Sequence, residues 1–196
     1  HHELVKEVVS LDRSQDYEAA IQLLTDQPQK ELGQELGIIL AMSYMAQYDE
    51  YTTDPSIVKA IAILQKVIQQ FKQREIVETE KSPSGDTDAL EHIKFWKAFA
   101  QMQMGWANEL NGNSINGALL TRKGALEMGQ LRDNTDAQAL HAIYEYYLGG
   151  ITSKLPWMED QRDEHLKVIL KGIDSSEYFS DLFRTTAIWI YYDRKE

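Results

Sequence analysis

Apolar residues recur at helical spacing along nearly the whole chain, and this periodicity constrains the fold more than any other feature. From Ile57 to Phe71 they fall at i, i+4, i+7, i+11 and i+14, which is the pattern of an amphipathic α-helix. Few segments alternate apolar and polar residues at a period of two, so a β-sheet is not expected. The sequence therefore predicts an all-α protein.

Four helical segments of similar character recur along the chain, each next to a longer helix that is rich in aromatic residues and Met. They begin at Ala20, Ala60, Ala118 and His165, so the intervals between them are 40, 58 and 47 residues. Recurring helix pairs are typical of an α-solenoid, in which stacking buries apolar surface that one pair leaves open. We expect eight or nine helices in antiparallel pairs.

Two segments are predicted to interrupt the helices. Residues 73–88 carry Ser, Pro, Gly and several acidic side chains, so we expect them to form an exposed loop insertion. The pair Gly149-Gly150 is expected to end the helix that begins at Thr135. Residues 3–196 are predicted to form one domain, and His1 and His2 are interpreted as the remnant of a tag.

The charge balance narrows the class of partner. The chain has 196 residues, with 20 Lys and Arg against 31 Asp and Glu, which gives a formal net charge of -11. This acidic balance argues against general nucleic-acid binding and against docking on anionic lipid. The longest apolar stretch, Gly37 to Met42, is far shorter than a membrane-spanning helix, so membrane insertion is not expected.

The compartment stays open at this stage. No charged and then apolar leader begins the sequence, but a chain cut after a natural leader would look the same. A soluble protein of the bacterial periplasm or envelope and a cytoplasmic protein both fit.

Motifs for catalysis are not found in the sequence. It has no cysteine, no G-x-S-x-G elbow, no phosphate-binding glycine loop and no HExxH, so we predict neither an enzyme nor a cofactor or metal. The residue types of His141, Glu145 and His165 leave one alternative open, a helical enzyme that depends on a small ligand or a metal.

The third helix pair resembles a tetratricopeptide repeat. That motif places a large, a small and an aromatic residue on helix A, and small residues seven positions apart on helix B. Phe99, Met102 and Trp106 are similar to the first set, and Ala118 and Ala125 to the second. The resemblance implies a right-handed α-α superhelix of antiparallel pairs, although the intervals exceed the 34 residues of that repeat.

Two further segments carry a resemblance. The segment that begins at Thr186 is similar to a helix A with Tyr191 at its aromatic position. The stretch from Tyr144 through Leu155-Pro-Trp157 to Leu166 resembles bacterial repeat proteins of envelope type, in which a Leu-Pro-Trp connector joins two helices.

The tetratricopeptide resemblance implies a non-enzymatic scaffold that binds a protein or peptide segment in a concave groove on the helix A side. Polar and aromatic side chains off the core stripe are predicted to line this groove: Lys94, Lys97, Gln101, Asn108, His141, Tyr144 and Glu145. A self-assembling component is the other alternative, because apolar ends of repeat arrays need caps. Tyr191 and Tyr192 would then contribute to a homo-oligomer.

The aromatic residues give a test of this interpretation. Phe99 and Trp106 lie on nearly one helix face, and both are predicted to be core residues. Tyr144, Tyr146 and Tyr147 fall within four positions and cannot all face one core, so at least one is expected to point outward.

Overall fold

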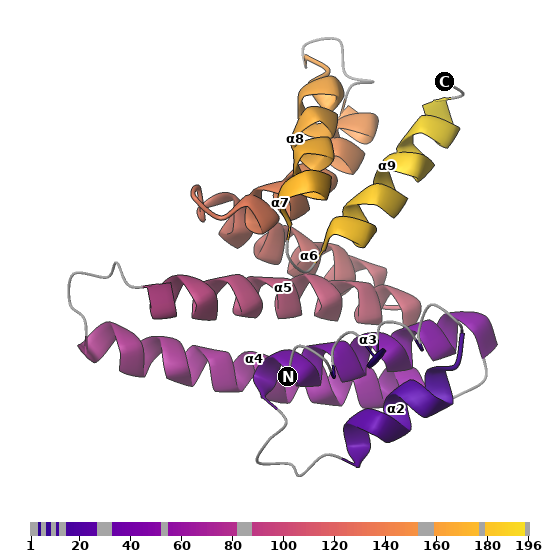
Figure 1. The fold of residues 1–196 in the computed structure, drawn as a ribbon, viewed down its shortest axis with the longest axis vertical. Helices are drawn as coiled ribbons and strands as arrows, with labels where there is room; N and C mark the ends of the chain where they lie inside the picture. The colour runs from indigo at the N-terminus through magenta and orange to yellow at the C-terminus, as the bar shows by residue number, and fades with distance from the viewer. Residues whose placement is uncertain are drawn as a thin grey trace. The chain divides into compact units, whose positions relative to one another are not determined.

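The computed structural model describes residues 4, 7, 8, 11, 15–26, 33–51, 55–81, 88–152, 159–176 and 179–194 (Figure 1). Its helices are α2 (Tyr17–Thr25), α3 (Gln34–Tyr51), α4 (Ser56–Lys81), α5 (Asp88–Leu110), α6 (Ser114–Gly129), α7 (Thr135–Thr152), α8 (Arg162–Ser175) and α9 (Ser180–Arg194). No strand occurs among these residues, so the predicted all-α class is confirmed. In the same part of the chain, no helix combines the length and the apolar character needed to cross a membrane.

Contacts among these residues divide the chain into two units, His1–Gly124 and Ala125–Glu196. The first unit holds α2 to α5 and most of α6. The second holds the C-terminal end of α6 together with α7, α8 and α9. The single domain over residues 3–196 and the right-handed superhelix both stay predictions.

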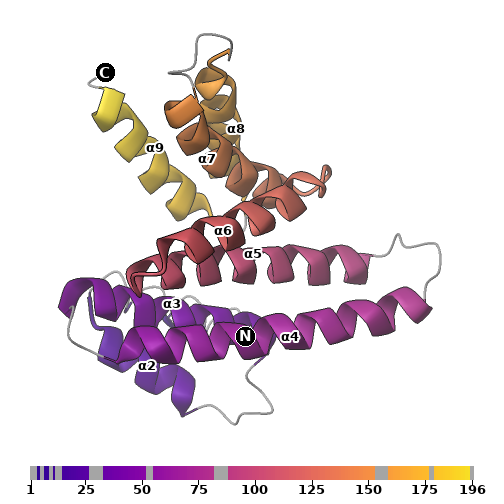
Figure 2. The same cartoon turned by 180° about the vertical axis from the view of Figure 1, so that it is seen from behind.

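Helices α3, α4 and α5 contact one another and form the body of the first unit. Figures 1 and 2 show α4 and α5 side by side along most of the length of α5. A Cβ atom at Gly37 of α3 would lie 2.8 Å from Cγ2 of Val67 in α4. Because glycine has no side chain, α3 and α4 approach closely at this point.

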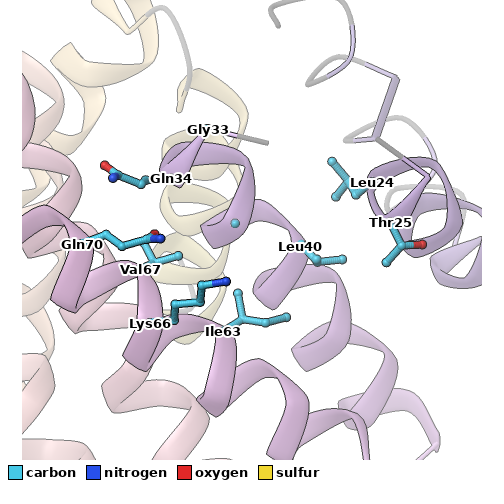
Figure 3. Close-up of a pocket in the computed structure, with 10 residues that line it drawn as sticks. Leu24, Thr25, Gly33, Gln34, Leu40, Ile63, Lys66, Val67 and Gln70 are labelled. Carbon is cyan, nitrogen blue, oxygen red and sulfur yellow. The ribbon is translucent and has the colours of Figure 1, made fainter. Parts of the chain in front are cut away.

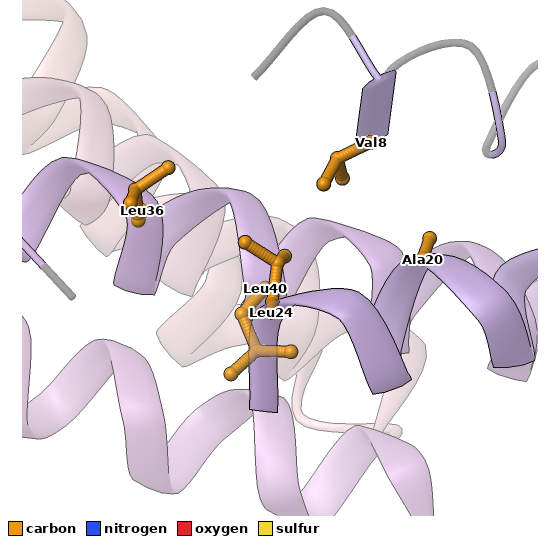
Figure 4. Close-up of a cluster of buried hydrophobic side chains, with 5 residues drawn as sticks. All are labelled: Val8, Ala20, Leu24, Leu36 and Leu40. Carbon is orange, nitrogen blue, oxygen red and sulfur yellow. The ribbon is translucent and has the colours of Figure 1, made fainter. Parts of the chain in front are cut away.

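Helix α2 packs on α3 through a small aliphatic cluster. The buried members are Val8, Ala20, Leu24, Leu36 and Leu40 (Figure 4). The side chain of Asp16 caps α2, since its Oδ1 accepts a hydrogen bond from Ala19 N at 3.3 Å. This packing places α2 beside α3 and leaves room next to α4, which the site described below uses.

Helices α5 and α6 form a hairpin whose backbones touch through glycine. A Cβ atom at Gly105 would lie 2.7 Å from the carbonyl oxygen of Gly117, and one at Gly124 would lie 2.6 Å from that of Ala98. Gly117 and Gly124 are seven positions apart on α6 and both face α5. The small residues of this pair therefore lie one position before the predicted Ala118 and Ala125; of those two, Ala118 is exposed and Ala125 is buried.

The three helices of the second unit meet at Gly172 of α8. A Cβ atom there would lie 2.9 Å from the Cβ of Ala139 in α7 and 2.8 Å from Cδ2 of Phe183 in α9. Helix α7 begins with a cap, because Asn134 Oδ1 accepts a hydrogen bond from Ala137 N at 2.9 Å. Helices α7 and α8 pack on one another, and α9 packs on α8.

The predicted loop insertion at residues 73–88 is wrong over its first half, because α4 continues to Lys81. Glu, Gln, Lys and Arg are strong helix formers, and they outweigh the weak apolar pattern here. Arg74 Nη1 also donates to Gln34 Oε1 at 2.6 Å, and Lys97 Nζ lies 2.6 Å from Glu75 Oε2. These contacts tie the exposed end of α4 to α3 and α5.

The predicted stop at Gly149-Gly150 is also wrong, because α7 continues to Thr152. A Cβ atom at Gly149 would lie 3.0 Å from Cγ of Arg162. The two glycines thus leave space for the Arg162 stem against α7. The Leu155-Pro-Trp157 connector lies outside the described residues.

The predictions for the aromatic residues are partly confirmed. Phe99 is 1% exposed and belongs to the core as predicted, whereas Trp106 is 42% exposed, so its assignment to the core is wrong. The tyrosine prediction is confirmed, since Tyr146 is buried and Tyr147 is exposed.

Candidate binding site

The predicted site residues of α5 differ in how accessible they are. Lys94 is half-buried near the start of the helix. The Lys97 side chain is 12% exposed, and its ammonium lies 2.6 Å from Glu75 Oε2 of α4. Lys97 therefore already has an ionic partner inside the protein, while Lys94 keeps part of its surface open.

Gln101 and Asn108 lie deeper in the same helix. Gln101 is 2% exposed and Asn108 is 8% exposed. Asn108 Nδ2 donates to Met104 O at 2.8 Å, and its Oδ1 accepts from Asn116 Nδ2 of α6 at 3.1 Å. Both side chains offer little surface to a partner, and Asn108 helps to join α5 to α6.

The three predicted residues of α7 are at positions i, i+3 and i+4, so their side chains share one face of the helix. His141 Nδ1 lies 2.9 Å from Ala125 O, which requires a proton on Nδ1 because a carbonyl oxygen only accepts. The Nε2 atom of the same ring lies 4.0 Å from Glu145 Oε1. His141, Tyr144 and Glu145 are all half-buried, so they form one accessible group of ionic and aromatic side chains.

The predicted residues thus fall into two sets, with Lys94, Lys97, Gln101 and Asn108 in the first unit and the three α7 residues in the second. Each set lies on a single helix. A groove shared by both sets stays a prediction.

A hollow that sequence reasoning missed lies in the first unit, between α2, α3 and α4 (Figure 3). Its volume is about 300 Å³, and Leu24, Leu40, Ile63 and Val67 form its apolar lining. The polar lining consists of Thr25, Gln34, Lys66 and Gln70. Gln34, Gln70 and Arg74 also line a second hollow of about 450 Å³ between α3, α4 and α5.

An arginine ties the three helices of the second unit together at one end. Arg194 Nε of α9 donates to the Tyr146 hydroxyl of α7 at 2.8 Å, and its Nη1 donates to Asp163 Oδ1 of α8 at 2.7 Å. The guanidinium also lies over the Tyr146 ring, 5.2 Å from the centroid. The hydrogen bonds to Asp163 and Tyr146 raise the pKa of Arg194, so this contact stays cationic at all ordinary pH values.

A second ion pair closes the N-terminal end of α8. Arg162 Nε donates to Asp160 Oδ1 at 2.9 Å and to Oδ2 at 3.0 Å. The side-chain hydrogen bond from Arg162 lowers the pKa of Asp160 to about 2. Together with the stem of Arg162 on Gly149, this pair fixes where the chain enters α8.

Groups of three or more His, Asp or Glu side chains that would suit a metal ion do not occur in the described ranges. His165 is half-buried on α8. Among the described residues, the structure therefore offers no set of metal ligands that would support a metal-dependent enzyme.

The fold defines the class as an all-α protein whose helices pack against their neighbours in the chain. No family, no curated protein and no solved structure matches the sequence.

Proposed function

We propose that the protein is a tetratricopeptide-like scaffold that binds a protein or peptide segment without catalysing a reaction. The observation that carries this proposal is the α5–α6 hairpin, in which Gly105, Gly117 and Gly124 bring two helix backbones into contact. A large and a small residue of the helix A motif and both small residues of helix B occur at this contact, which includes no aromatic residue of α5. Met104 and Gly105 supply a large and a small residue on helix A, and Gly117 and Gly124 supply small residues seven apart on helix B.

The packing of α3, α4 and α5 supports the same proposal. Helix α3 contacts both its immediate successor and the helix after that, as helices of stacked pairs do. Such a scaffold holds its binding surface rigid, so little conformational entropy is lost when a peptide docks. Lys94 on α5 and His141, Tyr144 and Glu145 on α7 are the predicted residues with surface left for a peptide.

The proposal is tested by screening the full-length chain against a peptide array and then measuring the affinity of a selected peptide by calorimetry. Lys94→Glu and Tyr144→Ala are the informative variants, because both side chains are half-buried. Lys123→Glu provides the matched control, since Lys123 is an exposed lysine of α6. We expect the first two variants to weaken a peptide selected from the array by about three- to thirtyfold, and the control to leave its affinity unchanged. Equal affinity for all three proteins would reject the α5 and α7 surfaces.

Self-assembly is a second candidate function, and the outer face of α9 favours it. Ile188, Trp189 and Tyr192 are each more than half exposed, and the Trp189 and Tyr192 rings pack edge to face with centroids 6.0 Å apart. Exposed apolar patches of this kind often mark interfaces. Sedimentation equilibrium would show a dimer that Trp189→Ser abolishes and that Ile115→Ser, at a still more exposed apolar site of α6, preserves. A monomer at all concentrations would exclude this candidate.

A further inference from the structure

A stripe of basic side chains runs along one side of α4 in the first unit. Its cationic members are Lys59, Lys66, Arg74 and Lys81, with Ile63 and Gln70 between the first three. The steps along this stripe are three or four residues, so the side chains share one helix face. No acidic residue occurs in α4 between Ser56 and Arg74, although the whole chain carries a net charge of -11.

The cations of the stripe are engaged to different degrees. Lys59 Nζ lies 5.3 Å from the centroid of the Tyr44 ring. Arg74 Nη1 donates to Gln34 Oε1 at 2.6 Å and also lies 3.9 Å from the carboxylate oxygen Oε1 of Glu35. Lys81 Nζ lies 3.4 Å from Glu78 Oε2, in an exposed pair. Lys66 is exposed and forms no ion pair with any residue that the structure describes. It is thus the cation of the stripe with the most capacity for an external anion.

The hollow between α2, α3 and α4 opens beside Lys66 (Figure 3). Lys66 is the one charged side chain among its described lining residues, and the aliphatic groups of Leu24, Leu40 and Ile63 surround the rest. Gln34 and Gln70 line both this hollow and the second one near Arg74. The two hollows therefore follow one another along the basic stripe.

We propose that this stripe and its hollow bind an acidic peptide segment that carries one large apolar anchor. The inference rests on the proposed peptide-binding function and places the partner on α4 of the first unit. The hollow of about 300 Å³ accommodates one aliphatic or aromatic side chain, and Lys66 at its edge neutralises a carboxylate next to that anchor. The net charge of -11 repels every anionic partner, but it repels a long polyanion such as nucleic acid more than a segment with few acidic residues, so of the two the short segment is favoured.

The spacing of the cations specifies the partner further. Lys59, Lys66, Arg74 and Lys81 are seven or eight residues apart, which is about 10–12 Å along an α-helix. A peptide in the polyproline II conformation rises about 9 Å in one turn of three residues, so every third side chain points to the same side. The best segment thus has an acidic residue at every third position and its anchor beside the acid that meets Lys66.

Fluorescence anisotropy with a synthetic probe tests the proposal. The probe is a labelled dodecapeptide with Asp at every third position and one central Leu. Lys66→Glu is expected to raise the dissociation constant about three- to tenfold, and Lys66→Gln to raise it less. Lys72→Glu is the matched control, because Lys72 is an exposed lysine on the opposite face of α4. It should change the dissociation constant less than twofold, and Leu→Ala in the probe should weaken binding at least about fivefold.

Three results would overturn the inference. The first is an equal loss of affinity for the probe in Lys66→Glu and Lys72→Glu, which would indicate non-specific attraction between the charges. The second is undiminished binding of a probe with Lys in place of every Asp. The third is a preference of the same protein for single-stranded DNA or for phosphatidylserine vesicles over the probe. Any of these would leave the α5 and α7 surfaces of the proposed function untouched, because Lys94→Glu and Tyr144→Ala are measured with array-selected peptides.

Discussion

Replacing Gly105 by alanine should destabilise the protein, against the usual effect of that change in a helix. The new Cβ atom would lie 2.7 Å from both the carbonyl oxygen of Gly117 and the amide nitrogen of Thr121. Both contacts are with backbone, so a rotamer change cannot relieve them and α5 and α6 must separate. Overpacking of this kind costs about 1–3 kcal/mol, whereas the higher helix propensity of alanine returns only about 1 kcal/mol.

Urea unfolding followed by circular dichroism measures this balance, and Gly150→Ala is the control. A Cβ atom at Gly150 of α7 has Nη1 of Arg162 as its nearest neighbour, at 3.9 Å. That change should therefore be neutral or stabilising by up to about 1 kcal/mol. Gly105→Ala should lower the free energy of unfolding by about 1 kcal/mol or more relative to this control. A Gly105→Ala protein as stable as Gly150→Ala would refute the glycine contact between α5 and α6.

Other predictions follow from the described contacts. Phe99→Ala should lower the free energy of unfolding by about 3–5 kcal/mol in the same urea assay, since the ring is fully enclosed. Tyr146→Phe removes the oxygen that accepts from Arg194, which should cost about 0.5–1.5 kcal/mol and speed hydrogen exchange in α9; unchanged exchange would contradict this role. The Asp160 carboxyl should titrate with a pKa of about 2 by NMR and return toward 3.8 in Arg162→Gln, so its stabilisation is complete above pH 3.8 and is lost as the pH falls toward 2.

Periodicity was sufficient to predict the helices, because apolar stripes of three- and four-residue spacing have no other common structural meaning. The fold class follows from it, and the segments predicted to begin at Ala20, Ala60, Ala118 and His165 lie within α2, α4, α6 and α8. Local signals were weaker guides. The Gly149-Gly150 pair indicates a helix end only when nothing packs on it, and here the stem of Arg162 does.

The residues through which α5 and α6 touch could be identified only from the structure. Ala118 and Ala125 have the predicted spacing, but Gly117 and Gly124, with the same spacing, are the residues that touch α5. Sequence spacing fixes which residues share a face, and it does not fix which of two adjacent faces meets the partner helix. Because the spacing does not identify the face that meets the partner helix, it predicts Trp106 in the core, whereas the side chain is exposed.

The basic stripe of α4 was visible in the sequence as a run without acidic residues, from Ser56 to Arg74. A binding role for the stripe could not be predicted from the sequence, because the hollow beside Lys66 depends on how α2 packs against α3. The burial of Gln101 likewise depends on neighbours that are distant in sequence. Side-chain types therefore predicted candidates, and packing decided their accessibility.

NMR titration of the ¹⁵N-labelled protein with a peptide selected from the array tests the central claim most directly. If the protein is a peptide-binding helical scaffold, amide shifts should change in contiguous stretches of α4, α5 or α7 while the helix pattern of all chemical shifts stays the same. An absence of shift changes for every array-selected peptide, or changes spread evenly over the chain, would contradict it.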